Sequence, residues 1–172
     1  MPTKPDLTLP PTCPEAIPYR TISDVHPVAL YTLADLSDDE LQELQKVSES
    51  NCQLPDDKKG TNVRIAPRPR FVGQPLRAVY DAHLELGKDS DAKFDRVLFI
   101  VAHEKDWRAA GVLLVTLDDA DDPDEPECRP DLCRVPAEEA GMAAVNVQIC
   151  NISWEDTKEG SLPLDGAGGE ER

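Results

Sequence analysis

The sequence has no apolar run long enough to cross a membrane, and it has few basic residues for its size. Its longest apolar runs, residues 97–102 and 111–115, fall well short of the roughly 18 residues that a membrane-spanning helix needs. Lysine and arginine number 18 against 34 acidic residues, which gives a formal charge of −16. Nucleic-acid binding requires clustered basic side chains that displace counterions. The composition therefore predicts neither a membrane nor a nucleic acid as partner, and the charge favours a basic protein.

A secretory signal is also lacking, because no apolar stretch follows a basic one at the start of the chain. The five cysteines are odd in number and irregularly spaced: Cys13, Cys52, Cys128, Cys133 and Cys150. Without an export signal, this pattern predicts reduced thiols and a cytoplasmic location. Nothing in the sequence indicates an oligomeric state.

The fingerprints of common cofactor and metal sites are missing. No glycine-rich phosphate or dinucleotide loop occurs, and no G-x-S-x-G nucleophile elbow. Cys128 and Cys133 form one loose pair, whereas structural zinc sites usually show two close pairs. Counting from Asp118, the acidic run has Pro123 and Arg129 where a calcium loop needs Gly and Glu. The sequence therefore predicts no metal and no cofactor.

Proline is abundant at the start of the chain, and glycine and acid are abundant at its end. Each proline in residues 1–18 lacks an amide donor and fixes its own φ, so we expect neither helix nor central strand there. From about residue 160 onward there are few large apolar side chains. We therefore predict flexible tails at 1–19 and 159–172 around a single domain at 20–158.

Strand patterns alternate with helix patterns along this domain. Between them we expect a loop at 53–60 and a solvated acidic loop at 118–127. The predicted strands are 28–33, 61–65 (ended by Pro67 and Pro69), 94–102, 111–117, 132–135 and a last one in which Val145, Val147 and Ile149 alternate with polar residues.

Two longer helices are predicted. The first begins at Ser37, which forms a capping box with Glu40, and ends near Ser50. The second begins at Pro75 and ends at Gly87. A closing turn or short helix is expected at residues 154–156. The apolar face of the second helix consists of Leu76, Val79, Tyr80, His83 and Leu84.

Two continuous apolar runs, 97–101 and 112–115, set the fold class. Runs without alternation are typical of strands that are covered on both faces, as in the middle of an α/β sheet. The link 103–110 is too short for a crossover helix, so these two strands are predicted to be antiparallel. The sequence therefore predicts an α/β or α+β domain with a mixed central sheet of about five strands flanked by helices.

Three stretches carry a recognisable pattern. An apolar strand ends in Val-Ala at 101–102 and is followed by a second apolar strand and an acidic pair. Residues 134–139 read Arg-Val-Pro-Ala-Glu-Glu, and residues 146–155 read Asn-Val-Gln-Ile-Cys-Asn-Ile-Ser-Trp-Glu. Over about 30–158 the chain thus resembles an uncharacterised family of small α/β domains, a domain of unknown function numbered six-nine-two-four. The resemblance implies a fold but no activity, cofactor or catalytic residue.

The candidate catalytic groups follow the strand 94–102. His103 and Glu104 begin like the zinc-protease motif, but that motif needs a second His where Trp107 stands. What remains is His103 with Glu104 and Asp106, just past the end of a buried strand, where α/β proteins often bind ligands. The alternative interpretation is a polar loop whose Trp107 packs onto the core.

Two further features have structural interpretations. His83 lies on the apolar face of the second helix, where a hydrogen-bonded core histidine is commoner than a ligand. The basic cluster of the sequence could bind a partner's aromatic groove, or it could pair with this protein's own acidic loops or stay solvated, and the excess of acid favours the second interpretation. Its members are Arg64, Arg68, Arg70 and Arg77.

These observations favour a noncatalytic interaction or regulatory module whose acidic surface meets a basic partner. A small hydrolase or transferase is the alternative, with His103 as acid or base and Glu104 or Asp106 as its partner. A third hypothesis is an inhibitor that mimics nucleic acid through an ordered acidic loop.

Overall fold

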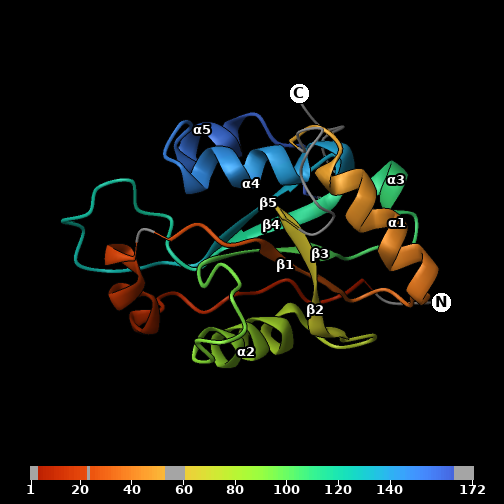
Figure 1. Cartoon of the computed structure of the whole chain (residues 1–172), viewed down its shortest axis with the longest axis horizontal. Helices are drawn as coiled ribbons and strands as arrows, with labels where there is room; N and C mark the ends of the chain where they lie inside the picture. Colours follow the sequence, from red (N-terminus) through yellow and green to blue (C-terminus); the bar gives the residue numbers. More distant parts are fainter. Residues whose placement is uncertain (1–3, 23, 53–60, 165–172) are drawn as a thin grey trace.

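The structure, a computed structural model, describes residues 4–22, 24–52 and 61–164 (Figure 1). The predicted loop 53–60 and residues 165–172 of the predicted C-terminal tail lie outside the described residues.

One mixed sheet lies at the centre of the described part of the chain, with strand order β2-β1-β3-β4-β5. β1 is parallel to β2 and β3, and β4 is antiparallel to β3 and β5. Every residue of β1, β3 and β4 is buried, which confirms that the apolar runs are central strands. The predicted fold class is therefore confirmed. The strands are β1 (Val28–Thr32), β2 (Val63–Arg70), β3 (Leu98–Ala102), β4 (Val112–Thr116) and β5 (Asp131–Val135).

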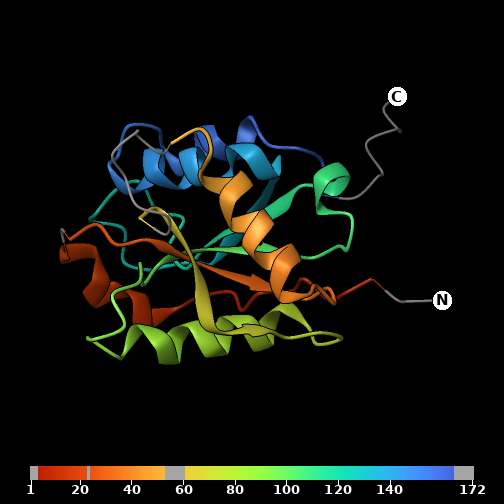
Figure 2. The same cartoon turned by 45° about the vertical axis from the view of Figure 1, so that its right-hand side comes forward.

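Helices cover both faces of this sheet (Figures 1 and 2). One face carries α1 (Asp38–Glu49), α4 (Ala140–Gln148) and α5 (Trp154–Glu159). The other carries α2 (Leu76–Gly87) and the 3₁₀ helix η1 (Pro14–Thr21). Short helices α3 (Trp107–Ala110) and η2 (Ala137–Glu139) lie in connections. Each face of the sheet thus has its own apolar core, and side chains that alternate along a strand enter one core or the other.

The two predicted helices are confirmed with their local signals. The Ser37 hydroxyl accepts from the amide of Glu40, and the Glu40 carboxylate accepts from the amide of Ser37, so the capping box is complete. α2 follows Pro75 and ends at Gly87. Both helices begin where a short sequence pattern satisfies or removes the amides that a helix leaves unpaired.

The predicted last strand is wrong, because Val145 and Val147 lie in helix α4. Alanine is the strongest helix former, and the buried or partly buried positions Ala140, Ala144 and Val147 have helical spacing. A Cβ added at Gly141 would lie 2.4 Å from the carbonyl oxygen of Ser48. α4 therefore packs closely on α1, and this contact is invisible in the sequence pattern.

The predicted strand 61–65 is too short, because β2 continues to Arg70 through Pro67 and Pro69. β2 is an edge strand that pairs only with β1, and the register shifts where the prolines pass. Amides on the outer side of an edge strand need no partner, so a missing proline N–H costs little there.

The expectation for residues 1–18 needs a correction, because a 3₁₀ helix forms at its end. Cys13 and Ala16 are fully buried, and Leu7 and Leu9 pack against the same core. The Cys13 amide donates to the carbonyl oxygen of Cys128 at 2.7 Å. Prolines exclude an α-helix here, but an extended segment that ends in a 3₁₀ turn can still cover apolar surface.

His83 is a hydrogen-bonded core residue, as predicted. Its Nε2 donates to the carbonyl oxygen of Asp95 at 3.0 Å, and its Nδ1 accepts from the Tyr31 hydroxyl at 2.8 Å. A protonated ring would have to give up the bond from Tyr31, and burial disfavours its charge. Burial lowers the pKa of His83 to about 4.

This low pKa predicts a loss of stability in mild acid. Because the unfolded chain binds a proton at His83 between pH 6.5 and about 4 and the folded chain does not, stability should fall through that window as pH decreases. The full loss is about 3 kcal/mol. Urea unfolding at several pH values gives the free energy of unfolding of the protein and of His83→Gln as two pH profiles. The difference between the two profiles measures this loss. Parallel profiles would show that His83 titrates alike in both states.

Candidate functional site

The candidate catalytic residues follow β3, as expected, and no described hydrogen bond joins His103 to Glu104 or Asp106. His103 is buried, and its Nδ1 has no hydrogen-bond partner among the described residues. Glu104 and Asp106 are exposed, and Asp106 caps α3 by accepting from the Ala109 amide at 3.4 Å. Burial lowers the pKa of His103, and the negative charge of Glu104 partly offsets this effect. Trp107 is buried, as the alternative interpretation expected.

The crevice beyond the carboxyl ends of β1 and β3 is bridged by the chain itself. α1 and α2 leave the sheet on opposite faces, so this is the switch point where open α/β sheets usually bind ligands. Lys105 Nζ donates to the carbonyl oxygen of Asp35 at 2.6 Å. The Leu33 amide donates to the carbonyl oxygen of Ala102 at 2.8 Å. These bonds tie the two strand ends together.

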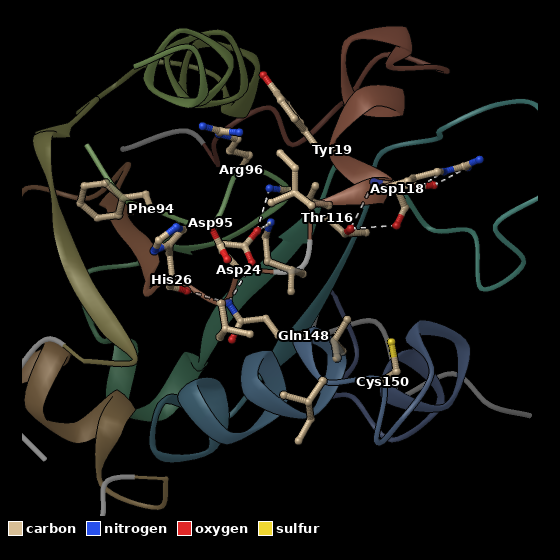
Figure 3. A pocket seen from close by; sticks show the side chains of 17 residues that line it. Tyr19, Asp24, His26, Phe94, Asp95, Arg96, Thr116, Asp118, Gln148 and Cys150 are labelled. Atoms are coloured by element: carbon tan, nitrogen blue, oxygen red, sulfur yellow. Dashed lines mark hydrogen bonds and ion pairs between the residues drawn. The ribbon is translucent and has the colours of Figure 1, made fainter. Parts of the chain in front are cut away.

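A cavity of about 540 Å³ lies at the opposite end of the central strands, beside the amino ends of β1 and β3 (Figure 3). Its walls come from four stretches of the chain: the end of η1 with the segment that leads into β1, the turn before β3, the end of β4 with Asp118, and the end of α4. We call it the amino-edge cavity. Its volume lies in the range of small-molecule and side-chain binding pockets.

Asp95 forms the polar floor of the amino-edge cavity. Its Oδ1 accepts from the amides of Val97 and Leu98, both at 2.7 Å, and its Oδ2 accepts from Gln148 Nε2 at 2.8 Å. Burial raises the pKa of Asp95, although these hydrogen bonds and the nearby His26 act in the opposite direction. The carboxylate therefore pays a desolvation cost, and no cationic side chain bonds to it among the described residues.

Further polar groups surround this floor. Gln148 Nε2 also donates to the carbonyl oxygen of His26 at 2.8 Å, which joins α4 to the segment before β1. Figure 3 shows Asp24, His26 and Gln148 among the lining side chains. Asp24 is exposed and has no ion-pair partner among the described residues. The Asp24 carboxylate and the His26 carbonyl oxygen are thus hydrogen-bond acceptors near Asp95.

Aliphatic side chains form the rim. Ile22, Val25 and Ile149 line the cavity with exposed fractions of 42%, 58% and 56%. Large apolar side chains that gather around a hollow mark a binding surface more often than single exposed ones do. Arg96 lies over the ring of Tyr19, with its Cζ 5.4 Å from the ring centroid, and both residues line the cavity.

Arg20 lines the cavity where it adjoins the acidic loop. Its Nε and Nη2 donate to the two carboxylate oxygens of Asp118 at 2.7 and 3.0 Å. The same guanidinium donates to the carbonyl oxygens of Pro123, Glu125 and Glu127. One side chain from η1 therefore holds the predicted acidic loop at several points along its backbone.

The remaining candidate groups have structural roles. No group of three or more metal-ligating side chains occurs in the part of the chain that the structure describes. Cys13, Cys128 and Cys133 are buried free thiols, and burial raises the pKa of each of them. Arg70 pairs with Asp38 in α1, and Arg77 pairs with Asp81 in α2, so two members of the basic cluster pair with acids of this protein, although these acids lie in helices and not in the predicted acidic loops.

Sequence reasoning did not identify Asp95 or Gln148. A signal for Asp95 existed, because an Asp placed two or three residues before an apolar strand can accept from the strand's first amides. Gln148 was hidden by the wrong assignment of its segment to a strand.

No family model, curated protein or solved structure matches the chain. The resemblance to the uncharacterised domain family therefore stays a prediction. No helix in the described ranges is both long enough and apolar enough to span a membrane.

The clamp made by Arg20 predicts a change in loop dynamics. Arg20→Gln should speed amide hydrogen exchange in residues 118–127 by about tenfold or more, because the carbonyls and Asp118 lose their common donor. Exchange mass spectrometry measures it. Arg129→Gln is the matched control, since Arg129 forms a single, more exposed pair with Asp119 in the same loop. Equal effects of the two substitutions would contradict the clamp.

Proposed function

We propose that this protein is a noncatalytic interaction module that binds a basic segment of another protein at the amino-edge cavity. The observation that carries the proposal is the cavity itself, a hollow with carboxylates in its lining and exposed Ile22, Val25 and Ile149 at its rim. Exposed apolar side chains next to charged groups are a common composition of a protein interaction site.

The charge of the chain supports a basic partner. A formal charge of −16 attracts cationic segments over distances comparable to the Debye length and raises their association rate. Asp24 at the cavity has no ion-pair partner among the described residues, whereas Asp118 is already bound by Arg20. A positively charged side chain of the partner would thus find an unpaired acid next to apolar surface.

The geometry gives less support to the two other hypotheses. A hydrolase or transferase needs His103 aligned with a carboxylate, and the exposed Glu104 and Asp106 make no hydrogen bond to it in the described structure. A mimic of nucleic acid needs unneutralised acid, but Arg129 pairs with Asp119 in the acidic loop, and Lys158 pairs with Asp131 beside it.

Selection from a library of random displayed peptides tests the proposal. We expect the enriched peptides to combine lysine or arginine with a neighbouring aliphatic or aromatic residue, and their affinity to fall as salt rises. Val25→Lys should weaken a selected peptide about tenfold or more, because it places charge and bulk at the apolar rim.

Val72→Lys is the matched control. Val72 has an exposed fraction of 46% and does not line the cavity, so this substitution makes the same change of charge elsewhere. Binding that is insensitive to Val25→Lys, or equally sensitive to both substitutions, would place the partner at another surface. A library that yields no binder would remove the basis of the proposal.

A further inference from the structure

We infer that the amino-edge cavity selects the side chain of a lysine, with its ammonium group on Asp95 and its aliphatic stem against the apolar rim. The inference rests on the proposed function and specifies which residue of the basic segment enters the cavity. It follows from the acceptors on the floor, the unpaired charge of Asp95 and the composition of the walls.

The floor offers acceptors and few donors. Asp95 Oδ2 accepts one described hydrogen bond, from Gln148, and a carboxylate oxygen can accept two. Both bonds that Gln148 makes use its Nε2, so its amide oxygen has no partner among the described residues. Asp24 adds a second carboxylate to the lining. A ligand that fits these groups must donate hydrogen bonds and carry positive charge.

Electrostatics favours a cation at this position. Asp95 is desolvated, and its hydrogen bonds come from two amides and a carboxamide rather than from a cationic side chain. The arginines that line the cavity are occupied elsewhere: Arg20 bonds to Asp118, and Arg96 lies over Tyr19. His26 also lines the cavity and its charge lowers the pKa of Asp95, but no described hydrogen bond joins its ring to the carboxylate. An ammonium ion that enters the cavity would offset the desolvation of the carboxylate, as in other paired buried charges.

The walls fit the stem of a lysine. Val25 at the rim, together with Phe94 and Val147, gives the cavity apolar walls. Lysine buries a four-carbon stem along apolar surface while its compact ammonium group donates three hydrogen bonds. Arginine instead presents a planar fork of five donors that suits two carboxylate oxygens side by side. Because Asp95 Oδ1 already accepts two amides, the floor favours the compact group.

The test compares three small probes that share a backbone: Nα-acetyl-lysine N-methylamide, its norleucine analogue and its arginine analogue. Titration of the ¹⁵N-labelled protein, followed by amide chemical shifts, reports both the affinity and the place of binding. We expect the lysine probe to shift the amides of Val97, Leu98 and Gln148 and to bind roughly tenfold more tightly than the norleucine probe. The arginine probe should bind more weakly than lysine.

Two isosteric substitutions locate the ammonium group. Asp95→Asn and Asp24→Asn should each reduce the preference for lysine over norleucine, with the larger loss at Asp95. Asp39→Asn, on the exposed face of α1, makes the same change of net charge and should leave the preference unchanged. If Asp95→Asn alters the amide spectrum as a whole, the lysine assignment is judged from two other measurements. These are the preference for the lysine probe over the norleucine probe in the unmodified protein and in Asp24→Asn.

The outcomes separate this inference from the proposed function. Equal binding of lysine and norleucine probes, or a preference for arginine, overturns the lysine assignment while selected peptides that depend on Val25 still support the docking surface. Shifts confined to the acidic loop show an ion atmosphere only and overturn the assignment as well. Loss of all peptide binding overturns both.

Discussion

The hydrogen bonds of Asp95 hold the layers of this domain together. Its side chain accepts from the first residues around β3 and from Gln148 at the end of α4, and its carbonyl oxygen accepts from His83 in α2. Its amide donates to the carbonyl oxygen of Pro27, just before β1. One residue thus forms hydrogen bonds with both helical layers and with the amino ends of β1 and β3. A charged group in this position costs desolvation energy, so its hydrogen bonds must be numerous and well directed.

The fold class could be predicted because its determinants are local. Two apolar runs without alternation mark central strands. The predicted link 103–110 between them is too short for a crossover helix, so the pair had to be antiparallel. The capping box at Ser37 fixes the start of α1 by hydrogen bonds between residues three apart. Signals of this kind lie within a few residues of one another, so a single sequence contains them in full.

The parts that could not be predicted depend on contacts between distant segments. Alternation of Val145, Val147 and Ile149 favours a strand, but the alanines of this segment and the packing of α4 on α1 through Gly141 make it a helix. Pro67 is tolerated in β2 because that strand is at the sheet edge, a position that no local pattern reveals. The same holds for the cavity, whose walls come from four separate segments of the chain.

The location of the cavity follows from what covers the two ends of the central strands. At the carboxyl ends of β1 and β3, the short link from β3 to β4 carries Lys105. Its Nζ donates to the carbonyl oxygen of Asp35, and this bond closes the crevice between the two strand ends. At the amino ends of these strands, the chain enters β1 from η1. Arg20 in η1 bonds to the acidic loop instead of to the sheet. The space between η1, α4 and the strand ends therefore stays open. A site at this end of the strands is formed by connections that lie far apart in sequence, so its acids and aliphatic side chains come together only in the folded chain.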